Sequence, residues 1–282
     1  MNVIRVIPEL RTVLDAHRRD GKTIGFVPTM GYFHDGHRSL MRRAREATDV
    51  VVVSLFVNPA QFNDPKDLAA YPRDEERDFG IASEEGVDLM FAPAPGEIYP
   101  PGFATSVSVG GITEHLEGAS RGAAHFAAVA TVVAKLFNIV EPNTAFFGQK
   151  DAQQALVIRR MVRDLDLRLR IEVCPTVREA DGLAMSSRNV RLDSAARQQA
   201  RVLSAALFAA EKSVADGTRD PKSVLATARE VLAHVGVSPE YLELVSADTL
   251  APVSEVRGEM LLAVAAQIGG VRLIDNTILR AE

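Results

Sequence analysis

The sequence predicts an α/β fold in which a doubly wound, mostly parallel sheet is followed by a smaller α+β domain. In the first half, short runs rich in β-branched residues alternate with amphipathic helical segments, which is typical of a parallel sheet with helices on both faces. Residues 50–57 are almost wholly apolar, as expected for a strand covered on both sides. The alternation ends near residues 175–177, so we expect two domains, 1–176 and 177–282.

Each predicted element has a local signal. Pro8 suits the first turn of a helix, Gly86 marks a helix end, and residues 170–174 alternate with the period of two that a strand requires. In the first domain these signals predict helix 8–19, strand 24–27, helix 39–47, strand 50–57, helix 74–85, strand 88–92, helix 125–140, strand 144–147, helix 151–165 and strand 170–174. In the second they predict helices 194–216 and 221–235 and strands near 241–245, 260–265 and 271–276.

The composition is that of an ordinary globular protein and excludes several classes. The 282 residues are 47% hydrophobic and 24% charged, with a formal net charge of −5 and no basic block, so we expect no nucleic-acid partner. No run approaches the roughly 18–20 apolar residues that span a bilayer, and the N-terminus lacks an export signal, so we expect no membrane partner. The single cysteine, Cys174, excludes an intramolecular disulfide framework and fits the cytoplasm.

The most informative motif is His34-Asp35-Gly36-His37. It lies where the predicted strand 24–27 gives way, through a turn at Gly31, to a helix. The N–H groups and the dipole of a helix N-terminus favour an anion, and two imidazoles can donate hydrogen bonds to phosphate oxygens. Gly36 would let a flat group lie against the backbone. The alternative is a loop with two ordinary surface histidines.

A second strand exit carries Phe147-Gly148-Gln149-Lys150-Asp151. Lys150 is a mobile point charge suited to phosphate, and Asp151 can accept hydrogen bonds from ribose hydroxyls. Alternatively, Asp151 is a helix N-cap and Lys150 is solvated. Both interpretations of Asp151 can hold together.

Ser186-Ser187-Arg188 lies beyond the predicted domain boundary. Two hydroxyls beside a guanidinium make a small anion cup, although such a tripeptide is also common in ordinary turns. Because the linker near Thr176 separates this tripeptide from the first two motifs, the sequence predicts a site that uses both domains. Together with His34, His37 and Lys150, the tripeptide indicates a triphosphate with its Mg²⁺.

Asn58 and Gln61 follow the predicted strand 50–57 at its carboxyl end, where ligands enter an open parallel sheet. They could hold a hydroxy acid, or they could form a polar turn with an Asx hydrogen bond. Other nucleotide motifs are absent: the sequence has no Gly-x-x-x-x-Gly-Lys-Ser/Thr loop and no Gly-x-Gly-x-x-Gly after the first strand. The histidines have no zinc-ligand spacing, so we expect no metal site made by protein side chains.

These motifs together resemble those of the pantoate–β-alanine ligase family. The histidine motif and Met185-Ser186-Ser187-Arg188 are also similar to the ATP-binding signatures of class I aminoacyl-tRNA synthetases and related nucleotidylyltransferases. The resemblance implies a Rossmann-like first domain and a smaller C-terminal lid domain. It rests on Pro28-Thr29-Met30-Gly31, His34-x-Gly36-His37, Phe56-Val57-Asn58-Pro59 with Gln61-Phe62, Tyr71-Pro72-Arg73, Phe147-Gly148-x-Lys150-Asp151-x-Gln153-Gln154 and residues 178–189.

The resemblance implies a two-step reaction with ATP as a substrate. The carboxylate of pantoate would attack the α-phosphate of Mg·ATP to give a bound pantoyl adenylate and pyrophosphate. The amine of β-alanine would then attack the acyl carbon and release pantothenate and AMP. Mg²⁺ would bind mainly through the ATP phosphates, and the protein would be a homodimer.

The resemblance also implies roles for residues of this sequence. Catalysis is expected of His34, His37, Lys150 and Arg188, with His37 as the proton donor. Pantoate and β-alanine are expected at Gln61 and Gln154, with Asn58 in support. ATP binding is expected of Met30, Gly31, Tyr32, Phe33, His34, Asp35, Gly36, His37, Gly148, Gln149, Lys150, Asp151, Val177, Met185, Ser186, Ser187 and Arg188.

The sequence departs from the family pattern near the expected acid site. Arg121 stands four residues before His125, where the family has a three-residue step, and Ala60 and Ala128 replace a frequent Met and Gly. No phosphate ligand is lost, so we expect activity. One alternative is a related nucleotidylyltransferase that acts on another small acid. A second is a nucleotide-binding regulatory protein, which the complete set of expected phosphate ligands disfavours.

Overall fold

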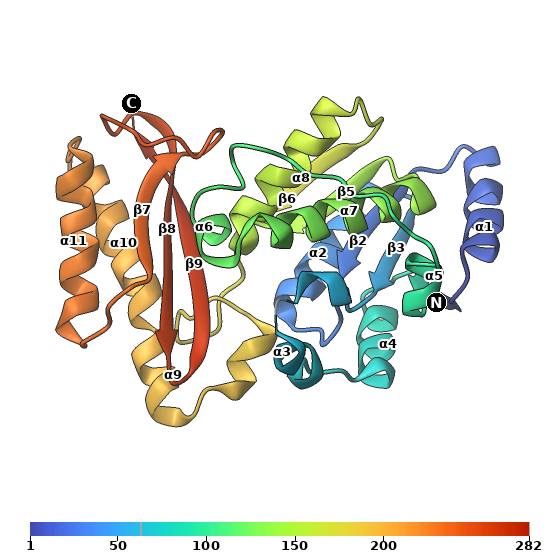
Figure 1. The fold of residues 1–282 in the computed structure, drawn as a ribbon, viewed down its shortest axis with the longest axis horizontal. Helices are drawn as coiled ribbons and strands as arrows, with labels where there is room; N and C mark the ends of the chain where they lie inside the picture. The colour runs from blue at the N-terminus through green and yellow to red at the C-terminus, as the bar shows by residue number, and fades with distance from the viewer. Residues whose placement is uncertain (63, 282) are drawn as a thin grey trace. The chain divides into compact units, whose positions relative to one another are not determined.

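The computed structural model describes residues 1–62 and 64–281, which form two compact units (Figure 1). Unit 1 comprises Met1–Gln149 and Gln153–Pro175, and unit 2 comprises Lys150–Ala152 and Thr176–Glu282. Glu282, the last residue of the predicted second domain, lies outside the described residues. The chain passes from unit 1 to unit 2 beside the boundary predicted at residue 176. Residues 150–152 group with unit 2, which the sequence pattern does not indicate.

Unit 1 is built on a six-stranded parallel sheet, which confirms the predicted α/β class. Its strand order is β1-β4-β3-β2-β5-β6. From β2 the chain proceeds to β3 on one side, whereas β5 lies on the other, so the order reverses between β2 and β5. In open α/β sheets, the loops that leave the carboxyl ends of the strands diverge at such a reversal, and ligands bind there. The strands are β1 (Asn2–Ile4), β2 (Ile24–Thr29), β3 (Val50–Leu55), β4 (Leu89–Phe91), β5 (Thr144–Gly148) and β6 (Arg170–Cys174).

Helices cover both faces of this sheet. Neighbouring residues of a strand point to opposite sides, and in β2 the side chains on both sides are apolar and buried. Phe26 of β2 meets Phe137 of α7 edge to face, with ring centroids 6.4 Å apart. The next residue, Val27, packs in a buried cluster with Met41 of α2. Helix α1 packs with α7, and α4 packs with α2. The helices are α1 (Ile7–Arg19), α2 (Asp35–Ala47), α3 (Pro65–Ala70), α4 (Glu75–Glu84), α5 (Pro95–Ile98), α6 (Glu117–Arg121), α7 (Ala123–Val140) and α8 (Ala152–Asp164), with the 3₁₀ turns η1 (Pro59–Gln61) and η2 (Gln149–Asp151).

Helix α7 corrects one expectation from the sequence. It has 18 residues and a mean hydropathy of 1.7, so by length and composition it could cross a membrane, as could no other helix of the described residues. However, 61% of it is buried inside the protein, and it packs against α1, α6, η1 and β2 of unit 1. This is the pattern of a core helix.

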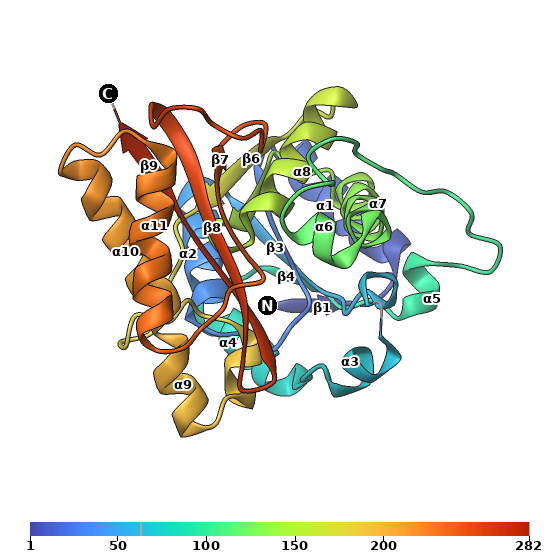
Figure 2. The same cartoon turned by 60° about the vertical axis from the view of Figure 1, so that its left-hand side comes forward.

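Unit 2 is an α+β layer in which three antiparallel strands, in the order β7-β8-β9, pack against helices (Figure 2). Gly269 and Gly270, with φ of 56° and 74°, join β8 to β9 in the left-handed conformation that a tight two-residue hairpin needs. The predicted helix 194–216 is wrong, since the chain forms two helices that meet at Arg201. The elements are η3 (Ser187–Arg191), α9 (Ser194–Ala200), α10 (Val202–Ala215), α11 (Pro221–His234), β7 (Tyr241–Ser246), β8 (Gly258–Ile268) and β9 (Val271–Ala281).

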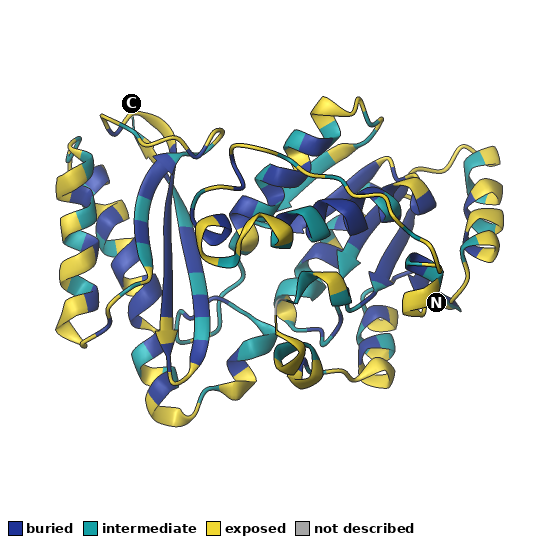
Figure 3. Ribbon diagram, viewed as in Figure 1, coloured by how far each residue is buried: buried dark blue, intermediate teal, exposed yellow. Residues whose placement is uncertain are grey.

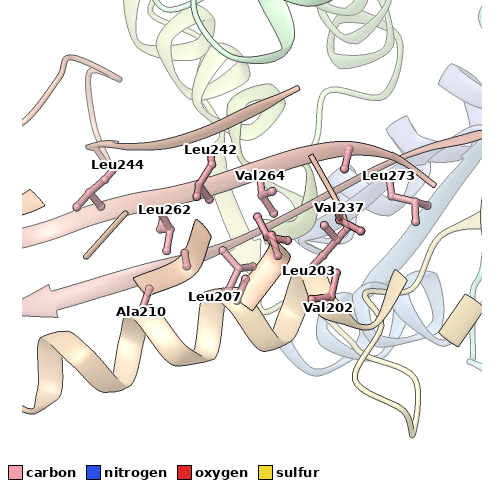
Figure 4. Close-up of a cluster of buried hydrophobic side chains, with 14 of the residues drawn as sticks. Val202, Leu203, Leu207, Ala210, Val237, Leu242, Leu244, Leu262, Val264 and Leu273 are labelled. Atoms are coloured by element: carbon pink, nitrogen blue, oxygen red, sulfur yellow. The ribbon is translucent and has the colours of Figure 1, made fainter. Parts of the chain in front are cut away.

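The core of unit 2 lies between its helices and its sheet. Leu203 and Leu207 of α10 face Leu242 of β7 and Leu262 and Val264 of β8 (Figure 4). All five are at most 5% exposed, while the outer surfaces of α10 and α11 are exposed (Figure 3). Burial of each such side chain stabilises the fold by roughly 1.5–3 kcal/mol. This core supports β9, which carries the buried polar residues Asp275 and Asn276.

Candidate functional site

The candidate residues fall into two groups, one in each unit. In unit 1, the two histidines form the N-terminal cap of α2. His34 is the N-cap residue, and its Nδ1 accepts a hydrogen bond from the Gly36 N–H at 3.1 Å. In return, the His34 N–H donates to Nδ1 of His37 at 3.4 Å. Ser or Thr with Glu or Gln usually forms such a capping box. The helix therefore begins at Asp35, and the predicted start at residue 39 is wrong.

The capping box determines where each imidazole carries its proton. A nitrogen that accepts a hydrogen bond is unprotonated, so in the neutral ring the proton sits on Nε2. The ring centroids of His34 and His37 are 4.2 Å apart. The pair thus presents two Nε2–H donors at one helix N-terminus, where the helix dipole also favours negative charge.

The turn before the histidines is held by a buried carboxylate on α4. Both oxygens of Asp78 accept backbone hydrogen bonds, from the Tyr32 N–H at 2.6 Å and the Phe33 N–H at 2.7 Å. Asp78 is 1% exposed, and burial raises the pKa of its carboxyl, although the two N–H donors oppose that shift. Gly31 has φ of 84°, and a Cβ there would lie 2.9 Å from the Asp78 carboxylate, so the turn requires glycine.

Arg77, which precedes Asp78 on α4, holds the same turn. Its Nη2 donates to the Phe33 carbonyl at 2.9 Å, and its guanidinium lies 5.3 Å from the centre of the Tyr32 ring. Tyr32 adopts φ of 52°, a left-handed conformation that few non-glycine residues take without support. The Phe33 side chain is fully buried in the core. Helix α4 therefore determines the path of the backbone into His34.

Asn58 is buried and makes a hydrogen bond that orients Gln61. Its Oδ1 accepts hydrogen bonds from the Tyr99 hydroxyl at 2.9 Å and the Ala60 N–H at 3.3 Å. Its Nδ2 donates to Oε1 of Gln61 at 2.9 Å and to the Ala128 carbonyl at 3.3 Å. An amide side chain offers four hydrogen bonds, and all four of Asn58 are made within the protein. Asn58 therefore acts through Gln61.

The segment around Arg121 is also held by hydrogen bonds. Arg121 pairs with Glu117 one helical turn earlier at 2.7 Å. Gln153, 5% exposed, accepts from the Glu117 N–H at 2.9 Å and donates to the carbonyls of Ile112 and His115 at 2.7 and 2.8 Å. Gln153 is thus a structural residue, whereas the adjacent Gln154 is half-buried.

In unit 2, Lys150 lies in η2, directly after β5 ends at Gly148. Its Nζ is 3.6 Å from Oδ1 of Asp151, which is exposed. Its backbone carbonyl accepts a hydrogen bond from Nδ2 of Asn276 at 2.8 Å. Lys150 is half-buried. The unit 1 candidates Met30, His34, Gly36, Gly148 and Gln149 are half-buried as well.

Ser186, Ser187 and Arg188 lie at the end of a short hairpin. Ser186 caps η3, because its Oγ accepts a hydrogen bond from the Arg188 N–H at 3.3 Å. The hairpin is closed by a bond from the Met185 N–H to the Val177 carbonyl at 3.0 Å. All three residues of the tripeptide are half-buried.

Sequence reasoning missed four residues that hold the candidate groups: Arg77 and Asp78 in unit 1, and Asp275 and Asn276 in unit 2. Asp78 shares the buried face of α4 with Ala82, so a charge on the apolar face of a helix was the available signal. Among the described residues, no group of three or more His, Cys, Asp or Glu side chains could hold a metal ion.

Comparison with known proteins identifies the family. The family model for pantoate–β-alanine ligase matches residues 2–278. The chain belongs to the pantoate–β-alanine ligase family. It is 50% identical to the pantothenate synthetase of Thermotoga petrophila, with 99% of this chain and 100% of that protein covered. It is also 50% identical to the pantothenate synthetase of Cereibacter sphaeroides, with 97% of this chain and 98% of that protein covered.

Solved structures of this ligase family share the fold. The crystal structure of pantothenate synthetase from Thermus thermophilus matches with a TM-score of 0.94 at 46% identity and covers 100% of both chains. The pantoate–β-alanine ligase of Francisella tularensis, complexed with beta-gamma ATP and β-alanine, matches with a TM-score of 0.81 at 35% identity, covering 99% of this chain and 97% of that one. The present ligase is thus an ATP-dependent enzyme of pantothenate biosynthesis.

Proposed function

We propose that this ligase condenses (R)-pantoate with β-alanine through an enzyme-bound pantoyl adenylate, releasing AMP and pyrophosphate. The observation that carries the proposal is the histidine pair. Two Nε2–H donors at the N-terminus of α2 follow the carboxyl end of β2, beside the switch point of the sheet. Donors in this position stabilise charge that develops on an α-phosphate and on departing pyrophosphate.

In unit 1, we assign the acid to Gln61 and Gln154. Asn58 orients Gln61 through its side-chain amide, as the 2.9 Å bond between them supports. With the carboxylate of pantoate held in line with the α-phosphate, its oxygen attacks phosphorus and the bond to pyrophosphate breaks. The Nε2–H of His37 donates a hydrogen bond to the leaving oxygen and stabilises the charge that develops there. The remaining unit 1 residues proposed to contact ATP are Met30, Gly31, Tyr32, Phe33, Asp35, Gly36, Gly148 and Gln149.

In unit 2, we assign the β- and γ-phosphates to Lys150, Ser186, Ser187 and Arg188. The two cations neutralise part of the charge that the leaving pyrophosphate gains, and the two hydroxyls donate hydrogen bonds to its oxygens. Mg²⁺ would be held mainly by the phosphates of ATP and would supply further positive charge there. Asp151 is proposed to accept from the ribose, and Val177 and Met185 to contact the nucleotide.

Product analysis tests this proposal directly. With pantoate carrying ¹⁸O in its carboxylate, the adenylate route transfers one labelled oxygen to AMP, because the carboxylate oxygen stays on phosphorus when β-alanine attacks the acyl carbon. We also expect pantoate-dependent exchange of pyrophosphate into ATP without β-alanine. ADP and phosphate as products would contradict the adenylate. A nucleotidylyltransferase for another acid would form no pantothenate when β-alanine is added.

Assembly and location are further parts of the proposal. We infer a homodimer in the cytoplasm from the resemblance to the ligase family. Light scattering on the purified protein tests the first point, with a mass of twice 30.5 kDa expected. A concentration-independent mass of one chain would contradict it.

A further inference from the structure

Two adjacent buried polar residues on β9, Asp275 and Asn276, lie outside the proposed catalytic set. They are 3% and 5% exposed. Burial of a carboxylate or an amide is unfavourable unless each group finds a partner. The partners that they find are the two segments of unit 2 that carry the proposed phosphate ligands.

Asp275 holds the base of the hairpin that leads to Ser186. Its oxygens accept two hydrogen bonds from Arg178, at 2.6 and 3.1 Å, and a third from the Asn276 N–H at 2.8 Å. Arg178 in turn donates to the Gly182 carbonyl at 3.2 Å, and its guanidinium lies 5.1 Å from the centre of the Phe208 ring. A bidentate carboxylate–guanidinium pair fixes the orientation of the Arg178 guanidinium as well as its distance from Asp275.

The hairpin transmits this position to the tripeptide. Arg178 pairs with Ala184 as an antiparallel bridge, and Met185 is bonded to Val177. Ser186 follows directly. A shift of Arg178 would therefore move the two serines and Arg188 with it.

Asn276 holds the backbone at Lys150. Its Nδ2 donates to the Lys150 carbonyl at 2.8 Å, and its position on β9 is set by the register Asn276↔Ala263 with β8. One short stretch of β9 is thus bonded to both segments that carry the proposed phosphate ligands.

We infer that Asp275 and Asn276 are positioning residues that set the ATP β- and γ-phosphate ligands of unit 2 as one group, Asn276 through Lys150 and Asp275 through Arg178. This inference rests on the proposed function of Lys150 and the tripeptide. The alternative is that the two residues serve only the stability of unit 2. A double-mutant cycle separates the two cases, because coupling in catalysis is not expected from a purely structural residue.

The cycle compares Asn276→Ala, Lys150→Ala and the double variant by kcat/KM for ATP. Lys150→Ala keeps the backbone carbonyl, so the structural bond from Asn276 persists in that variant. We expect Asn276→Ala to lower kcat/KM for ATP by about tenfold on its own, the scale of one lost positioning hydrogen bond, and to cause no further loss in Lys150→Ala. Thr277→Ala, a half-buried neighbour on β9, is the matched control and should retain activity.

The outcomes are distinguishable. An equal tenfold loss in both backgrounds, or no loss from Asn276→Ala, would overturn the inference while leaving the role of Lys150 intact. Normal activity of Lys150→Ala would instead overturn the proposed function. For the second arm, Asp275→Asn and Arg178→Lys should each raise KM for ATP several-fold with unchanged KM for pantoate and β-alanine. An unchanged KM for ATP in both folded variants would contradict it, and the Asn276 cycle remains decisive if either fails to fold.

Discussion

The two histidines are held by the backbone of their own helix, and this gives each a defined chemical role. Because each Nδ1 accepts an N–H, each neutral imidazole donates from Nε2. We expect His37→Ala and Lys150→Ala each to lower kcat by at least ~100-fold, the scale of removing one charge-stabilising donor. Steady-state kinetics with thermal unfolding as a folding control measures this. Near-normal turnover in both variants would contradict the mechanism.

The buried carboxyl of Asp78 should make the stability of the protein depend on pH. Burial raises its folded-state pKa above 3.8, so the unfolded chain loses this proton at lower pH than the folded protein does. The contribution of Asp78 to stability is therefore complete below the unfolded pKa and is lost as pH rises through the folded pKa. Urea unfolding at a series of pH values should show wild type losing stability relative to Asp78→Asn across that window, then no further change. A difference that grows in favour of wild type would contradict this.

At the scale of the element, the cap of α2 separates two functions of His34. An asparagine caps a helix well, whereas alanine does not. We expect the free energy of unfolding of His34→Asn to lie within about a few tenths of a kcal/mol of the wild-type value, and that of His34→Ala to be lower by about 1 kcal/mol. Both variants should lose catalytic activity. Denaturant unfolding and kcat, measured on the same preparations, test this. Equal stability of the two variants would show that the cap is not used.

The elements also show where prediction from sequence succeeds and fails. The strands β2 and β3 were predictable because runs such as residues 50–57 are buried on both faces and leave a continuous apolar signal. The start of α2 was not, because its cap is a pair of histidines in place of the usual Ser and Glu. The break at Arg201 was missed for a different reason: apolar periodicity continues through it, and neither Gly nor Pro marks it.

At the scale of the whole molecule, the candidate ligands were easier to predict than the residues that hold them. His34, Lys150 and Gln61 follow strand ends, where chain order alone places polar groups. Asp78 holds a turn 45 residues earlier in the chain, and Arg178 pairs with Asp275 at a separation of 97. Such pairs depend on how helices and strands pack, and one sequence has no local pattern that reports them.

A nucleotide that binds the proposed ligands of unit 1 and of unit 2 should protect backbone amides in both units. With a non-hydrolysable ATP analogue at about 100 times its Kd, exchange at amides that open only in the unbound protein should slow by up to about 100-fold.

Hydrogen exchange with peptide resolution should show this protection at residues 31–38 of unit 1 and at residues 185–190 of unit 2. The exposed face of α11 (Pro221–His234) is the internal control and should not change. In Lys150→Ala, protection should weaken in both segments at a fixed analogue concentration, because a single binding equilibrium governs them. Protection confined to residues 31–38 would contradict the assignments of Ser186, Ser187 and Arg188.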